Sequence, residues 1–365
     1  MLPTSRPVVH NFNAGPAILP PSVCEEASRA ILNYNDTGLS ILEIGHRTPL
    51  FQVILDEARG LVKELMDLGS AHEVLFLHGG ASTQFMQVPM NLLDSDEMAA
   101  YTDTGLWATK AIREARLFGH VEVACSSKED HYRHLPKSFD VPGTAKYLHI
   151  TTNNTVYGTQ WQDLSLFYQF GVPLVADMSS DILSRRLPFS QFDLIYAGAQ
   201  KNLGAAGVNL VIVNKNILGK VKRAIPTMMD YRAHIENGSL LNTPPVFAIY
   251  VSLLTLRWIK AQGGVPVVEQ RNAQKAALLY ETLDSIPLFH PTVAREDRSL
   301  MNVVFTIEDP LLEKEFLEIC RQEGMIGIRG HRTVGGFRIS LYNALPVESV
   351  QAITGLMKEF AQKKG

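Results

Sequence analysis

Residues 196–207, YAGAQKNLGAAG, are decisive for the fold because they place a single lysine directly after a strand-like run. Lys201 follows the apolar run LIYAG (194–198) and lies in a segment rich in glycine and alanine. Lysine is normally a solvated residue, and small neighbours offer its long side chain no lateral cover. The pattern therefore predicts a backbone that closely approaches a ligand, with one amine at that point.

Strand-like and helix-like segments alternate through the rest of the first two thirds of the chain. Most strand-like runs are continuously apolar, as expected for strands buried on both faces of a parallel sheet. The alternation predicts an α/β fold, in which ligands bind outside the carboxyl ends of the strands. We predict strands at 74–78, 98–102, 147–151, 173–178, 194–198 and 208–213, and helices at 83–93 and 106–119.

The C-terminal third predicts a second, smaller domain. A long helical stretch, FAIYVSLLTLRWIKAQGG, is followed by a helix at 268–286 that leads into it. A strand (MNVVFTI), a helix (LLEKEFLEICRQEG) and a further strand (FRISLYNAL) then predict a small α+β unit. At 365 residues the chain is long enough for two domains. We predict an N-terminal segment 1–20, a large domain 21–265 and a small domain 266–365.

Composition excludes several classes of protein. With 46% hydrophobic and 19% charged residues the chain is globular, and a net charge of -3 gives no general attraction to nucleic acid or acidic membranes. The scattered residues Cys24, Cys125 and Cys320 argue for a reducing compartment. No signal peptide or membrane-spanning segment is evident. We expect a cytoplasmic protein with neither nucleic acid nor membrane as partner.

An acid precedes the lysine at the end of the neighbouring predicted strand. Asp177 closes PLVAD, 24 residues before Lys201. Pyridoxal phosphate requires such a pair: the lysine forms a Schiff base with its aldehyde, and the carboxylate keeps the pyridine nitrogen protonated. A structural ion pair would use the same two residues, and the pair alone does not decide between these interpretations.

Two further features lie at predicted strand ends. In LFLHGGASTQF, a strand runs through Gly79 and Gly80 into a helix whose free N–H groups suit a phosphate, although such turns are frequently only turns. Trp107, just after the next strand, could stack on a flat cofactor, or it could be ordinary packing.

Taken together, motifs along nearly the whole chain resemble the phosphoserine aminotransferases. These are pyridoxal-phosphate enzymes of the aspartate-aminotransferase fold (fold type I), which have a large domain with a mostly parallel sheet and a smaller α+β domain. The motifs are highly specific only in combination. They are NFNAGPAILP, EIGHR, HGGASTQF, TGLW, NNTVYGT, ADMSSDILSR, YAGAQKNLGAAG, NGSLLNTPP and GHRTVGGFRISLYNA.

The resemblance implies roles for individual residues. Lys201 is similar to the Schiff-base lysine and Asp177 to the partner of the ring nitrogen, and both are implied to be catalytic. The resemblance also implies an obligatory homodimer. In it, Asn242 and Thr243 reach the cofactor phosphate of the neighbouring subunit. Some family members carry an arginine in the glycine loop, where this chain has Ser82 and Thr83. The implied cofactor-binding residues are Ala81, Ser82, Trp107, Thr155, Asp177, Gln200, Lys201, Asn242 and Thr243.

A second set of residues predicts an anionic substrate. The planar guanidinium of arginine suits carboxylate and phosphate alike, and two His-Arg pairs beside glycine are hard to explain as solvated surface. In the family these positions bind the substrate phosphate and carboxylates. The candidates are His46, Arg47, His331, Arg332 and Arg338.

The resemblance implies reversible transamination between 3-phosphohydroxypyruvate and glutamate, giving phosphoserine and 2-oxoglutarate in serine biosynthesis. Some relatives also act on 4-phosphohydroxythreonine in pyridoxine synthesis. Two alternatives are a serine–glyoxylate or alanine–glyoxylate type of aminotransferase, and a cofactor-free binding protein that retains the fold. His131 and His134 have metal-like spacing, but their charged neighbours predict an exposed loop and no third ligand is evident, so we predict no metal site.

Overall fold

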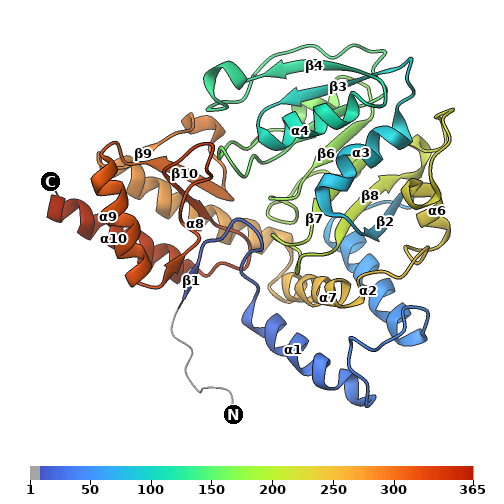
Figure 1. Cartoon of the computed structure of the whole chain (residues 1–365), viewed down its shortest axis with the longest axis horizontal. Coiled ribbons are helices and arrows are strands. Elements are labelled where there is room, and N and C mark those ends of the chain that lie inside the picture. Colours follow the sequence, from blue (N-terminus) through green and yellow to red (C-terminus); the bar gives the residue numbers. More distant parts are fainter. Residues whose placement is uncertain (1–8, 365) are drawn as a thin grey trace.

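The structure, a computed structural model, describes residues 9–364 of the chain. The first eight residues of the predicted N-terminal segment therefore lie outside the described residues. Figure 1 shows a sheet flanked by helices, with the C-terminal elements, coloured orange to red, gathered beside it. The N-terminal strand β1 (His10–Asn11) lies with these C-terminal elements, because it pairs in parallel with β11 (Met325–Ile326).

The central sheet has seven strands in the order β2-β8-β7-β6-β5-β3-β4. Strand β8 runs opposite to its two neighbours, and the remaining pairs are parallel. Strands β5, β6 and β7 are buried along their whole length, which confirms the interpretation of their continuous apolar runs. The strands are β2 (His72–Leu77), β3 (Met98–Asp103), β4 (His120–Ser126), β5 (Leu148–Thr151), β6 (Leu174–Asp177), β7 (Leu194–Gly198) and β8 (Asn209–Asn214).

Edge strand β4 was not predicted from the sequence. It reads HVEVACS and is exposed or half-buried throughout. Because polar residues alternate with apolar ones along it, a search for continuously apolar runs misses it. The mostly parallel α/β sheet itself is confirmed.

Helices cover both faces of this sheet. One apolar cluster joins the sheet to α3 and α4, and a second joins its other face to α2 and α7. Helix α7 is buried around most of its circumference, which explains why its sequence is apolar rather than amphipathic. The helices of this part are α1 (Pro21–Leu32), α2 (Pro49–Leu65), α3 (Gly80–Leu92), α4 (Leu106–Ala115), α5 (Ser165–Tyr168), α6 (Tyr231–Glu236) and α7 (Val246–Ala261).

The C-terminal region has its own antiparallel sheet, in the order β12-β10-β9, and its own apolar cluster. The predicted strand–helix–strand pattern is present as β10, α9 and β12. Phe12 packs into this cluster, so the N-terminal segment contributes to it. The elements are α8 (Val265–Ser285), β9 (His290–Pro291), β10 (Asn302–Thr306), α9 (Pro310–Gln322), β12 (Phe337–Ser340) and α10 (Val347–Lys364).

Helix α8 contributes to two apolar clusters. Val265 and Val268, at its start, belong to the cluster of the large sheet, whereas Leu279 and Leu283 belong to the C-terminal cluster. The boundary between residues 265 and 266, and the division into three segments, remain predictions. Among residues 9–364, no helix is long and apolar enough to cross a membrane.

Candidate active site

Lys201 lies in the turn after β7, at the edge where the parallel strands end. Its Nζ donates a hydrogen bond to Thr155 Oγ1 at 2.7 Å. Burial lowers the pKa of the ammonium group to about 8; the nearby Asp177 carboxylate opposes this and the Arg338 guanidinium adds to it. Lys201 is therefore an amine that loses its proton far more readily than an exposed lysine.

Asp177 ends β6, the parallel neighbour of β7, so it reaches the same edge of the sheet. Only 5% of its surface is exposed, and burial raises the pKa of its carboxyl group. The Ser179 backbone N–H donates to Oδ1 at 2.9 Å. Within residues 9–364 no lysine, arginine or histidine forms a salt bridge with Asp177. The structure therefore does not contain the ion pair that offered the alternative explanation.

Lys201 and Asp177 line one cavity of about 150 Å³. Seven of the residues predicted to bind the cofactor lie around it, contributed by α3, α4 and the loops after β5, β6 and β7. They are Ala81, Ser82, Trp107, Thr155, Asp177, Gln200 and Lys201.

Gly80, from the predicted glycine turn, also lines the cavity. Four further lining residues were not singled out from the sequence, namely Thr151, Asn153, Ser179 and Ser180. All four end or closely follow β5 and β6, so their position at strand ends was the signal that could have found them.

The glycine turn between β2 and α3 presents backbone N–H groups to this cavity. Gly79 and Gly80 have φ of 87° and 62°, values that favour glycine. A Cβ on Gly79 would lie 1.8 Å from Thr83 Oγ1, so a side chain has no room there. Helix α3 starts at Gly80, and its first N–H groups have no partner within the helix. The geometry is that of an anion site.

Trp107 lies in the first turn of α4 and forms one wall of the cavity. Its ring lies 6.4 Å from that of Phe85, and Lys110 Nζ sits 4.4 Å from the indole centroid. The buried Nε1 of Trp107 has no hydrogen-bond partner among the described residues. The Trp107 indole thus packs against Phe85 and also lines the cavity.

Gly204, after Lys201, has a different purpose from the one the sequence suggested. A Cβ on Gly204 would lie 3.0 Å from Ser252 Oγ of α7, which is tighter than most real contacts. Gly204 therefore lets the turn pack on α7, and the prediction that the small residues serve close approach to a ligand is wrong for this position.

Arg338 extends from β12 of the C-terminal region to the rim of the cavity. Its Nη1 donates to the Thr155 backbone oxygen at 3.3 Å, and its buried Nε has no hydrogen-bond partner within residues 9–364. Burial lowers the pKa of this guanidinium, and burial together with the Arg338 charge lowers the pKa of His331. Exposed Arg332 follows His331 on the same loop. Arg338 therefore lies beside the cavity, with His331 near it and Arg332 on the same loop as His331.

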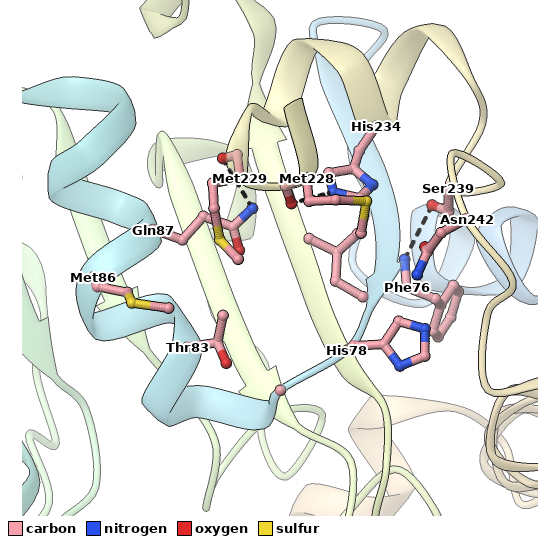
Figure 2. Close-up of a pocket in the computed structure, with 12 residues that line it drawn as sticks. Phe76, His78, Thr83, Met86, Gln87, Met228, Met229, His234, Ser239 and Asn242 are labelled. Atoms are coloured by element: carbon pink, nitrogen blue, oxygen red, sulfur yellow. Dashed lines mark hydrogen bonds between the residues drawn. The ribbon is translucent and has the colours of Figure 1, made fainter. Parts of the chain in front are cut away.

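The other predicted residues lie elsewhere on the chain. His46 and Thr243 line a separate cavity beside the start of α7. Asn242 lines another one next to α3, and Figure 2 shows it beside Ser239, across that cavity from Thr83 and Gln87. Exposed Arg47 lines none of these three cavities.

His131 lies on an exposed turn, as its neighbours predict, and His134 Nδ1 lies 2.9 Å from Asp130 Oδ2. Between residues 9 and 364 there is no group of three or more side chains that could hold a metal ion.

Comparison with known proteins identifies the family. The family model "Aminotransferase class-V" matches residues 9–353. Phosphoserine aminotransferase of Flavobacterium johnsoniae is 53% identical over 355 residues, which cover 97% of this chain and 99% of the relative. The solved phosphoserine aminotransferase of Bacillus circulans subsp. alkalophilus has a TM-score of 0.95 at 43% identity, covering 98% of this chain and 99% of the other.

A third similar protein is described as PLP-bound. This phosphoserine aminotransferase from Trichomonas vaginalis has a TM-score of 0.89 at 33% identity, covering 96% of this chain and all of the other. The likenesses confirm the predicted aspartate-aminotransferase-like fold with its mostly parallel sheet. The chain belongs to the class-V aminotransferases and, among them, to the phosphoserine aminotransferase family.

Proposed function

We propose that this protein is a pyridoxal-phosphate-dependent phosphoserine aminotransferase. It exchanges an amino group between glutamate and 3-phosphohydroxypyruvate, giving 2-oxoglutarate and phosphoserine. The observation that carries the proposal is the single cavity in which Lys201, with its pKa lowered to about 8, faces a buried Asp177. The relatives at about half identity support the choice of reaction.

The residues of the cavity fit pyridoxal phosphate. A cationic pyridine nitrogen would supply an opposite charge for the buried Asp177 carboxylate, which forms no salt bridge among residues 9–364. The N–H groups at the start of α3 suit its phosphate, and the Trp107 indole suits its flat ring. When bound, pyridoxal phosphate supplies an aldehyde for amine exchange and a ring that withdraws electrons from the substrate α-carbon.

Thr155 positions the amine of Lys201, and Lys201 moves the proton of the substrate α-carbon. The Thr155 hydroxyl accepts a hydrogen bond from Nζ, which fixes the amine at the cavity wall. Because the pKa of Lys201 is about 8, the neutral amine is accessible near neutral pH. It can accept a proton from the substrate α-carbon and return it, as a general base and acid. With pyridoxal phosphate bound, an ionised Asp177 would hold the cationic ring nitrogen, and that opposite charge would offset the burial that raises the pKa of Asp177.

The basic cluster of the C-terminal region binds the substrate. Arg338 lies against Thr155, and the loop that precedes β12 carries His331 and Arg332. A dianionic substrate loses its hydration in a closed site, and charge-assisted hydrogen bonds compensate that loss. Because the whole chain carries a net charge of -3, local arginines must provide them.

The enzyme acts in the cytoplasm as a homodimer with shared sites. His46, Arg47, Asn242 and Thr243 lie outside the cavity of their own chain, which supports their use in the site of a second copy. Two-fold symmetry is the commonest arrangement for such oligomers. A cytoplasmic location agrees with the scattered cysteines of the sequence.

The substrate assignment is tested with a glutamate-coupled assay that compares 3-phosphohydroxypyruvate with hydroxypyruvate. We expect a strong preference for the phosphorylated substrate, and Arg338→Ala should cost about 2–5 kcal/mol of that preference. Absorbance of the bound cofactor should be unchanged in the variant. Equal loss on both substrates would assign Arg338 to the carboxylate, and no preference in the wild type would favour a serine–glyoxylate or alanine–glyoxylate aminotransferase.

Shared sites are tested by mixing two inactive variants. Lys201→Ala and Arg47→Ala are expected to be weakly active alone. In a mixed dimer, one site would combine an intact Lys201 with an intact Arg47, so activity should reappear on mixing. A site built from one chain alone gives no recovery.

A further inference from the structure

A polar cavity between the large sheet and the C-terminal region lies outside the site described above. It measures about 640 Å³. Its walls come from the turn that holds Lys128–Asp130, from residues 292 and 306, and from the loop 330–336. The Ala294 backbone N–H donates to the Arg133 oxygen at 2.9 Å, which ties the two regions together at this point.

The charged side chains that line this cavity are cationic. They are Lys128 and Arg133, with the imidazole of His131 beside them, and no carboxylate lines the cavity. None of the three forms a salt bridge with an acidic residue in the described part of the chain. Asp130, on the same turn, pairs instead with His134 at 2.9 Å. In a chain of net charge -3, Lys128 and Arg133 therefore give the lining of this cavity a local excess of cations.

Neutral donors complete the lining. Tyr157 and three threonines contribute hydroxyl groups, and those of Thr306 and Thr333 make no hydrogen bond to any described residue. An arginine fork, a lysine point charge and free hydroxyls together match the several acceptor oxygens of a phosphate group. A carboxylate has fewer acceptors and would leave more of these donors unused.

We propose that this cavity is a second anion-binding site, which takes a phosphate monoester through Lys128, Arg133 and the threonine hydroxyls. Thr333 and Val334 belong to the loop that also carries His331 and Arg332. An anion held here is therefore one loop away from Arg338. The site holds the phosphorylated substrate before it enters the cavity lined by Lys201 and Asp177. This delivery role rests on the proposed function, whereas the binding of phosphate does not.

Binding is tested with inorganic phosphate as the probe. The cofactor-loaded Arg338→Gln variant lacks the main ligand of the inner substrate site, and calorimetry should still detect a weak phosphate site in it. Adding Lys128→Gln and Arg133→Gln should weaken that binding by at least about tenfold. Both side chains are exposed and unpaired, so folding should survive; an unchanged thermal midpoint checks this.

A matched control removes two charges at the opposite edge of the sheet. Arg116 follows the end of α4, and Lys220 follows the end of β8, which runs away from the site; both are exposed and neither forms a salt bridge with a described residue. Arg116→Gln with Lys220→Gln should leave phosphate binding unchanged. If the control weakens binding as much, or if Arg338→Gln binds no phosphate, the site is wrong.

Delivery is tested by kinetics in the wild-type background. Lys128→Gln with Arg133→Gln should lower kcat/KM for phosphoserine about three- to tenfold at low ionic strength, with kcat unchanged. The difference should vanish in high salt. An unchanged kcat/KM overturns the delivery role. If phosphoserine is not transaminated at all, the proposed function fails, and calorimetry still decides whether the second site exists.

Discussion

Two lysines with lowered pKa lie in two different regions of this protein. Lys201, at the strand ends of the large sheet, has one hydroxyl partner and opens onto a cavity. Lys275, on α8, is 2% exposed, and its Nζ donates to three backbone oxygens at 2.7–3.2 Å, those of Leu341, Tyr342 and Leu345. Burial lowers the pKa of Lys201 to about 8 and that of Lys275 to about 7.

The lowered pKa alone therefore does not distinguish a reactive lysine from a structural one. The hydrogen bonds do. Lys275 uses its donors on carbonyl groups just after β12, so its ammonium joins α8 to the chain before α10. Lys201 keeps donors available and has a buried acid nearby. An incompletely satisfied ammonium beside a cavity is the feature that indicates chemistry.

The largest expected effect separates the two lysines directly. Lys201→Ala should lower transamination by at least about 10²–10⁴-fold, because the group that moves the proton is lost. Lys275→Met, measured in the same assay at a temperature where it is folded, should remain active. Comparable losses in both variants would show that Lys275 is also part of the machinery.

A second test addresses the acid that distinguishes the Lys201 region. Asp177→Asn should lower kcat by about 10²–10³-fold, since a neutral amide cannot stabilise a protonated ring. The variant should still bind pyridoxal phosphate through the α3 loop, which absorbance can follow. Near-normal turnover would assign the role to another acid.

The Lys201 region was largely predictable because its residues lie at the ends of strands. Continuous apolar runs indicate those strands, and the side chain that follows each run lies at the ligand edge. Asp177 and Lys201 were found in this way. Residues such as Thr151 and Ser179 occupy equivalent positions but are common types, so the sequence did not single them out.

The Lys275 region could not be predicted in the same way. Its contacts join α8 to backbone atoms some 66–70 residues later, and a backbone acceptor leaves no trace in residue type. The role of Gly204 was misjudged for a related reason. Its close neighbour Ser252 belongs to α7, 48 residues later in the chain, and only the folded structure brings the two together.

For the free energy of unfolding, we expect the opposite order: substitution of Lys275 should have a larger effect than substitution of Lys201. Lys275→Met removes the donor for up to three buried carbonyl oxygens, each at a cost of about 1–3 kcal/mol if it stays unsatisfied. The free energy of unfolding, measured by denaturant titration of the apoprotein, should fall by several times more than in Lys201→Ala. Equal stability of Lys275→Met and the wild type would contradict the structural role.

The smallest effects concern the pKa of Lys201 itself. Competitive acetylation of the apoprotein across pH should give a half-maximal reactivity of Lys201 near pH 8, well below the ~10.4 of a model lysine. Because the Arg338 charge lowers this pKa, Arg338→Ala should move the midpoint to higher pH.

Asp177 acts in the opposite direction, since its charge favours the ammonium form, and so Asp177→Asn should move the midpoint to lower pH. Lys275 should stay unlabelled until the protein unfolds, because its amine is enclosed by the three carbonyl groups. Mass spectrometry of the labelled peptides measures the acetylation of Lys201 and of Lys275 in the same experiment. If both substitutions move the midpoint in the same direction, the two charges do not act on Lys201 as their positions require. If Lys275 labels in the folded protein as readily as Lys201, access to a cavity is not what separates the two lysines.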